Sequence, residues 1–132
     1  ARRTHGSRRR ALMRAEARLA FLGLLAIAGL LALNPGVPGI PAQFLGWDKL
    51  EHAAAFAALA LLLRYGWPEI GRRLQAAGLF AYGVAIELIQ GLPAIGRTPS
   101  LGDVVADCVG VAVGLLLGEA ALQIEKRLPG RS

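Results

Sequence analysis

The stretch LAFLGLLAIAGLLAL, residues 19–33, contains no charged or strongly polar residue. A helix formed by it is apolar on every face, whereas a surface helix of a soluble protein carries a polar stripe with a period of 3.6 residues. The whole chain has the same character, because 55% of its 132 residues are hydrophobic and its mean hydropathy is +0.48. We therefore predict an all-α protein that resides in a membrane.

Four apolar stretches are separated by short connections that contain Pro and Gly. Each is close to the ~20 residues that a helix needs to cross the hydrocarbon core of a bilayer. The sequence thus predicts an integral membrane bundle of four transmembrane helices over residues 19–124, between a basic segment at 1–18 and a basic tail at 125–132. The predicted spans are roughly 19–33, 50–67, 74–92 and 104–124.

The basic residues are distributed unevenly between the two predicted membrane faces. Of the 15 Lys and Arg residues, all but Lys49 and Arg97 lie in the N-terminal segment, the second connection or the tail. Cytoplasmic segments carry an excess of basic residues, so this distribution predicts that both termini are cytoplasmic. A basic segment directly before an apolar span also suits anionic lipids, and we expect these, rather than nucleic acid, as its partner.

The strongly polar residues that this rule leaves unexplained are expected to gather at the opposite, outer half of the bundle. Several form pairs three or four residues apart, so the members of each pair share a helix face. Their faces can converge on one pocket. The predicted cluster consists of Asp48, Lys49, His52, Glu87, Gln90, Arg97, Ser100, Asp103 and Asp107.

Two interpretations of this cluster stay open. Buried polar groups at helix ends can pin a bundle, with Ser100 or Asp103 capping the fourth helix and Asp48 capping the second. The same groups can instead bind a ligand or carry out catalysis, although no Ser-His-Asp arrangement marks a catalytic residue. The cluster lacks any two-histidine spacing, so we expect neither a metal ion nor another cofactor.

Small residues mark one face of the fourth predicted helix. Gly110, Gly114 and Gly118 recur every fourth position, which lets another helix approach closely, either within the chain or in a dimer. Cys108, the single cysteine, lies nearby in the same apolar stretch. We expect it to be a small buried packing residue.

Three segments together resemble the VanZ-like membrane protein family, which is named for a protein associated with teicoplanin resistance. They are DKLEHAAAFAALALLL from residue 48, AIELIQ from residue 85 and GRTPSLGDVVADCVGVAVG from residue 96. The resemblance covers residues 48–114 and implies a multi-pass protein of the bacterial cytoplasmic (inner) membrane, with the polar cluster as the family signature. Asp107 departs from the commoner Asn at its position.

Two functions are expected from these features. The chain either handles an envelope or lipid-linked molecule through the polar cluster, with Lys49 and Arg97 for an anionic group, or serves as an accessory subunit of a larger membrane complex. A homo-oligomer fits the second function as well, since small-residue faces favour close helix packing. A proton-coupled transporter would need several copies of so small a bundle, and enzymatic catalysis ranks below both main hypotheses.

Overall fold

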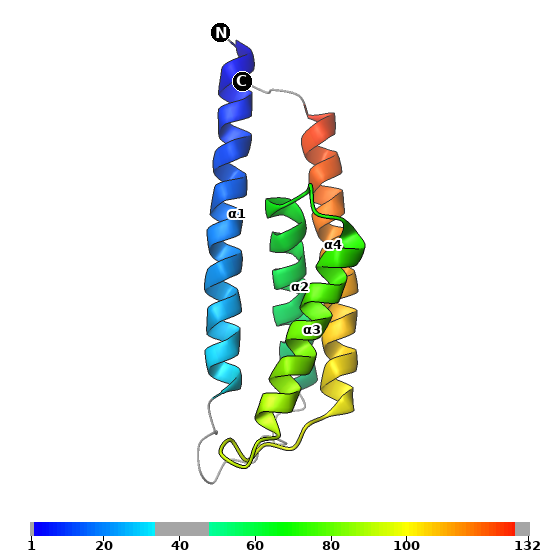
Figure 1. The fold of residues 1–132 in the computed structure, drawn as a ribbon. Helices are drawn as coiled ribbons and strands as arrows, with labels where there is room; N and C mark the ends of the chain where they lie inside the picture. The colour runs from blue at the N-terminus through cyan, green and yellow to red at the C-terminus, as the bar shows by residue number, and fades with distance from the viewer. Residues whose placement is uncertain (1, 34–47, 129–132) are drawn as a thin grey trace.

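The computed structural model describes residues 2–33 and 48–128, apart from the side chains of residues 2–4 and 48. Over these ranges the chain forms four α-helices and no strand (Figure 1), which confirms the all-α prediction. The helices are α1 (Arg2–Ala32), α2 (Asp48–Gly66), α3 (Arg72–Gln90) and α4 (Leu101–Arg127).

The first helix begins far earlier than the apolar stretch from which it was predicted. The basic segment predicted as a separate unit is helical from Arg2 onward and is continuous with the apolar part of α1. Its Arg, Ala, Leu, Met and Glu residues are all strong helix formers, and the first proline of the chain is Pro35. The other three helices begin and end within three residues of the predicted spans.

Successive helices run in opposite directions, so the helix termini gather at two ends of the bundle (Figure 1). The start of α1, the connection from α2 to α3 and the end of α4 lie toward one end, where α1 and α4 extend beyond the connection; we call it the arginine end after Arg64, Arg72 and Arg127. The other holds the start of α2, the end of α3 and the start of α4, and we call it the carboxylate end after Glu87 and Asp103.

The most extensive helix contact joins α2 to α4. A Cβ atom built on Gly110 would collide with the backbone oxygen of Ala53, and one on Gly114 with that of Ala57. One on Gly118 would lie 2.6 Å from the Cβ of Arg64. The glycine stripe thus packs within the chain and brings the backbones of the two helices together.

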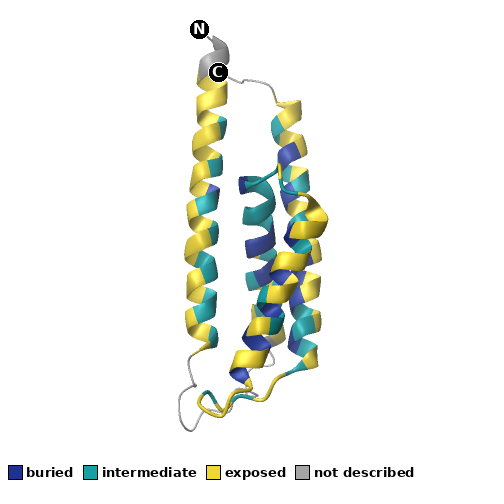
Figure 2. Cartoon of the chain, viewed as in Figure 1, coloured by how far each residue is buried: buried dark blue, intermediate teal, exposed yellow. Residues whose placement is uncertain are grey.

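Many positions along α1 and α4 are exposed (Figure 2). The centre of the bundle is apolar, but the buried residues also include two glutamines and three carboxylates, while Leu30 and Leu116 are 70% and 69% exposed. By length and composition, α1 and α4 could each cross a membrane. Only 17% and 33% of their most apolar windows are buried, whereas the core helix of a soluble protein is mostly buried. The buried core residues are Phe56, Leu59, Ala60, Leu79, Ile86 and Val111.

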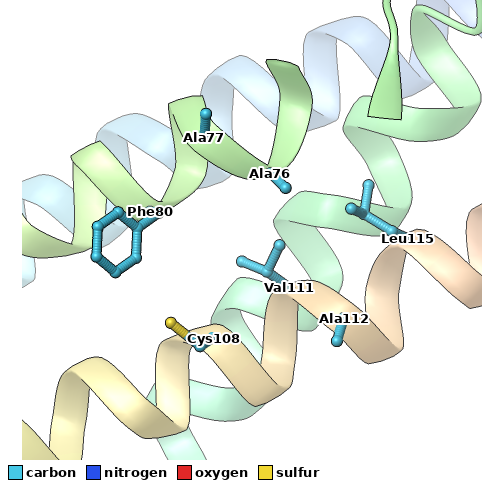
Figure 3. A pocket seen from close by; sticks show the side chains of 7 residues that line it. All are labelled: Ala76, Ala77, Phe80, Cys108, Val111, Ala112 and Leu115. Carbon is cyan, nitrogen blue, oxygen red and sulfur yellow. The ribbon is translucent and has the colours of Figure 1, made fainter. Parts of the chain in front are cut away.

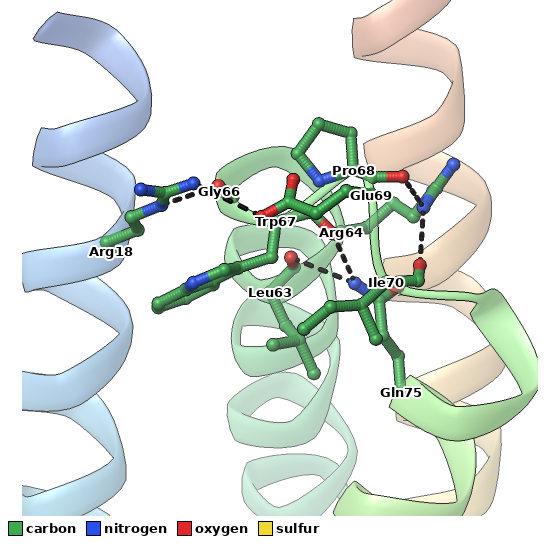
Figure 4. Close-up of polar contacts among 9 residues, drawn as sticks. All are labelled: Arg18, Leu63, Arg64, Gly66, Trp67, Pro68, Glu69, Ile70 and Gln75. Atoms are coloured by element: carbon green, nitrogen blue, oxygen red, sulfur yellow. Dashed lines mark hydrogen bonds and ion pairs between the residues drawn. The ribbon is translucent and has the colours of Figure 1, made fainter. Parts of the chain in front are cut away.

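Hydrogen bonds fasten the end of α2 at the arginine end (Figure 4). Gln75 Nε2 donates to the backbone oxygens of Leu63 and Trp67, at 3.2 and 3.0 Å. Arg18 Nε of α1 donates to the oxygen of Gly66 at 2.8 Å. The carbonyl groups of Leu63 and Trp67 also accept the backbone N–H groups of Trp67 and Ile70, so the side-chain donors add second hydrogen bonds at this helix end.

The arginine end also contains an ion pair between α2 and α4. Arg64 Nε donates to Glu119 Oε2 at 2.9 Å. Its Nη1 donates to the backbone oxygens of Pro68 and Ile70, as Figure 4 shows. Pro68 cannot continue α2 because proline lacks the amide donor. Arg64 therefore holds the turn that follows α2 against α4.

The close packing of α2 and α4 predicts opposite effects for one substitution at two glycines. Gly114→Ala should lower the free energy of unfolding by about 1–3 kcal/mol, because the added methyl group overpacks the contact with Ala57. Gly78→Ala is the control, since nothing lies within 4 Å of its Cβ position, and the higher helix propensity of Ala should raise stability there by up to about 1 kcal/mol. Unfolding in mixed micelles measures both, and equal effects at the two glycines would contradict this packing.

Candidate functional site

The centre of the carboxylate end is a contact between α2 and α4. His52 Nδ1 lies 3.0 Å from Asp107 Oδ1, next to the point where Ala53 and Gly110 bring the two backbones into contact. Asp107 is 3% exposed and His52 is partly buried. The tautomer of His52 decides which group donates, and opposite a carboxylate, which only accepts hydrogen bonds, the donor is Nδ1–H.

Glu87 of α3 caps the start of α4. Its Oε2 accepts a hydrogen bond from the backbone N–H of Ser100 at 2.9 Å, and the side chain is buried, at 4% exposure of the residue. Ser100 is the N-cap residue, but its own side chain makes no capping hydrogen bond. Ser100 and Asp103 were the capping residues that the sequence suggested, whereas the acceptor is the carboxylate of Glu87 from α3. A carboxylate here also interacts favourably with the positive end of the α4 dipole.

Lys49 and Asp103 form the most exposed pair of the site. Lys49 Nζ lies 3.6 Å from Asp103 Oδ1, and 64% of the Lys49 side chain is exposed, against 10% for Asp103. Such a pair contributes little to stability. Lys49 remains available to an anionic group that approaches this end.

Gly83 of α3 makes room for Asp107, which sequence reasoning did not foresee. A Cβ on Gly83 would lie 2.8 Å from Asp107 Oδ2 and 3.3 Å from Cζ of Phe56. The absence of a side chain lets α3 approach α4 at the level of the buried carboxylate. The position of this glycine four residues before Glu87, on the same helix face, was the available signal.

Several carboxylate oxygens in the site lack hydrogen-bond partners. Glu87 Oε1, Asp103 Oδ1 and Asp107 Oδ2 are buried and accept no hydrogen bond. One ligand-type atom from each of His52, Glu87 and Asp103 lies within 4.8 Å of the others. These three residues, which come from three helices, could hold a metal ion.

For three other predicted members of the cluster, Gln90, Arg97 and Asp48, the structure describes no side-chain hydrogen bond or ion pair with the residues above. Gln90 is buried, but its Nε2 donates to the oxygen of Ala32 at 3.4 Å and so fastens α3 to α1. Arg97 is partly buried, and within the described ranges its guanidinium makes no hydrogen bond or ion pair, while its backbone N–H closes the loop onto Gln90. The side chain of Asp48 lies outside the described residues.

The expectation that all strongly polar residues other than the basic ones lie at the outer end is wrong. A second set lies at the arginine end, where each member bonds to a backbone carbonyl or an arginine. The three glutamates of this set form ion pairs with arginines. Counting the basic residues alone does not reveal these pairs. This set consists of Glu69, Gln75, Glu119 and Glu125.

An apolar groove of about 470 Å³ lies between α3 and α4 (Figure 3). It continues the α3–α4 contact from Gly83 and Asp107 toward the arginine end. Cys108, predicted to be buried, is exposed and lines this groove instead of packing in the core. The lining residues are Ala76, Ala77, Phe80, Cys108, Val111, Ala112 and Leu115.

Comparisons of the chain with protein-family models, with curated proteins and with solved structures give no match. The assignment of a function therefore depends on the geometry of the carboxylate end and on the groove.

The capping by Glu87 predicts an unusual result for the N-cap residue. Ser100→Ala should change the free energy of unfolding by less than about 0.5 kcal/mol, although loss of a capping Ser ordinarily costs about 1 kcal/mol. Gln75→Leu is the positive control, because it removes two hydrogen bonds from a buried side chain and should cost about 1–3 kcal/mol. Unfolding in mixed micelles measures both. A full capping loss in Ser100→Ala would mean that its hydroxyl caps α4.

Proposed function

We propose that the chain is a four-span protein of the bacterial cytoplasmic membrane, with both termini and the arginine end of the bundle in the cytoplasm. The distribution of exposed and buried residues supports this, because the exposed surfaces of α1 and α4 are rich in Leu, Ile and Val while carboxylates are buried. Contiguous apolar surface of this extent is stable against lipid and costly in water. The 19 residues each of α2 and α3 give helices about 28 Å long, close to the ~30 Å of the hydrocarbon core.

The charges of the described residues support the same orientation. Basic residues at the arginine end are paired with Glu69, Glu119 and Glu125, yet they outnumber these acids. The carboxylate end has only Lys49 and Arg97 as basic residues. The rule that basic residues remain on the cytoplasmic side therefore directs the carboxylate end to the outer face.

The proposed activity is the binding of an anionic, lipid-linked molecule of the cell envelope. Its head group would lie at the carboxylate end near Lys49 and Arg97, and its hydrocarbon chain would lie in the groove between α3 and α4. The observation that carries this proposal is that the groove and the polar site lie at consecutive levels of the contact between α3 and α4, on either side of the close approach of Gly83 to Asp107. The resemblance of residues 48–114 to the VanZ-like family agrees with an envelope role.

Arg97 is the residue best suited to the anionic group. It is partly buried, and the described part of the chain gives its guanidinium no partner. A guanidinium binds phosphate or carboxylate through two parallel hydrogen bonds. Gly96, with φ of +67°, turns the loop just before Arg97 and bonds to Leu92, which holds the loop in place.

A second candidate is an accessory subunit that packs against a larger complex. The small-residue face that would favour such packing is already used within the chain, because Gly110, Gly114 and Gly118 contact α2. Exposed apolar surface for a partner remains on both α1 and α4, and it is most extensive on α1, whose most apolar window is 17% buried against 33% for α4. A protein that co-purifies in equal amount would favour this second candidate.

Filling the groove tests the proposed activity. Ala112→Phe places a large side chain among the lining residues and should reduce at least several-fold the lipid that is retained after purification in mild detergent. Val113→Phe adds a similar ring on the exposed face of the same helix, outside the groove, and should retain lipid as the unmodified chain does. Mass spectrometry of the purified proteins measures the retained lipid. Equal lipid retention in the two variants would rule out the groove as the binding site for the hydrocarbon chain of the lipid.

A further inference from the structure

The residues at the carboxylate end also form the ligand set of a metal ion. We propose that one divalent transition-metal ion, of the class of Zn²⁺ or Mn²⁺, binds between α2, α3 and α4 through His52, Glu87 and Asp103. One ligand-type atom from each residue lies within 4.8 Å of the others. This inference is separate from the lipid binding proposed above, because it concerns the ion alone.

The spacing of these atoms suits a single ion. Bonds of about 2.0–2.2 Å to nitrogen and oxygen place two ligands of one ion about 3–4 Å apart, so small side-chain rotations complete the set. Three protein ligands leave at least one coordination position for water or an anionic group. The expectation of no metal was based on the absence of two histidines on one helix, but here three helices supply one ligand each.

An unpartnered buried carboxylate oxygen supports the site independently of the spacing. Glu87 is 4% exposed, and its Oε2 accepts from Ser100 while its Oε1 accepts no hydrogen bond. Asp103 Oδ1 is likewise without a hydrogen bond, and its ion pair with Lys49 is long, at 3.6 Å, and solvent-exposed on the lysine side. A buried charged oxygen without a partner is costly, and an ion would supply the missing interaction.

The contact between His52 and Asp107 is the arrangement found behind metal-binding histidines. A histidine ligand usually donates its other ring N–H to a carboxylate, which fixes the ring and makes it a stronger ligand. Asp107 occupies that position, 3.0 Å from His52 Nδ1, which assigns coordination to Nε2. Asp107 thus acts as a positioning residue for the ion.

The charge and chemistry of the site identify the class of ion. Glu87, Asp103 and Asp107 bring three carboxyl groups to this end against the single ammonium group of Lys49, and this acidic excess suits a divalent cation. Imidazole favours transition metals, whereas Mg²⁺ and Ca²⁺ prefer oxygen ligands alone. Zn²⁺ and Mn²⁺ both accept a mixed set of nitrogen and oxygen.

The test is a metal titration of the purified chain. All proteins carry Cys108→Ser, so that no thiol binds metal, and are purified through a tag without histidine and then stripped with EDTA. Calorimetry with Zn²⁺ and electron paramagnetic resonance with Mn²⁺ measure the affinity and the number of ions bound. We expect one ion per chain, and Asp107→Asn should weaken the affinity by about 10- to 100-fold.

Variants of the ligands and matched controls decide the outcome. Glu87→Gln, Asp103→Asn and His52→Ala should each weaken binding at least 10-fold, whereas His5→Ala and Glu125→Gln, both in the arginine half of the bundle, should leave it unchanged. Thermal unfolding checks that each variant is folded. Should His52→Ala fail to fold, the near-isosteric variants Glu87→Gln and Asp103→Asn decide the outcome. Absence of binding by the folded parent chain, or binding that these folded variants do not weaken, would overturn the proposal.

Discussion

The close approach of α2 and α4 is the constraint on which the rest of the structure depends. Three glycines of α4 remove the side chains that would separate the helices, so Ala53 and Ala57 of α2 contact the α4 backbone directly. Interactions at either end of this contact then become possible: His52 with Asp107 at one end and Arg64 with Glu119 at the other. In a membrane, where lipid tails are as apolar as leucine, such packing and these polar bonds replace the hydrophobic effect as the forces that hold helices together.

The two ends of the bundle use buried polar groups in different ways. At the arginine end, Gln75 and Arg64 donate to carbonyl oxygens at and just after the end of α2, and so hold this turn in place. Buried atoms without a hydrogen bond lie at both ends, since Gln75 Oε1 and the carboxylate oxygens of Glu125 also lack one. The carboxylate end differs because its unbonded atoms, Glu87 Oε1, Asp103 Oδ1 and Asp107 Oδ2, are all carboxylate oxygens close to one histidine. Such a concentration of buried ionisable groups is typical of sites that bind something.

Much of the fold could be predicted from the sequence, because apolar stretches ended by Pro and Gly determine where helices lie. The helical start of α1 was missed, since hydropathy does not report the helix propensity of an arginine-rich segment. Spacing along each helix correctly grouped Asp103 with Asp107 on one face, but it could not reveal which helix faces which. The capping of Ser100 by Glu87, the turn of Gln90 toward α1 and the groove beside Cys108 all depend on contacts between helices.

The central claim is that the carboxylate end lies at the outer face of a four-span bundle, and cysteine labelling tests it most directly. In a Cys108→Ser background, single cysteines replace Ala94, in the exposed loop after α3, and Leu128, exposed just after α4. A membrane-impermeant maleimide added to spheroplasts should label Ala94→Cys at once and Leu128→Cys only after the membrane is permeabilised. Labelling of both positions in intact spheroplasts, or of Leu128→Cys alone, would contradict the account.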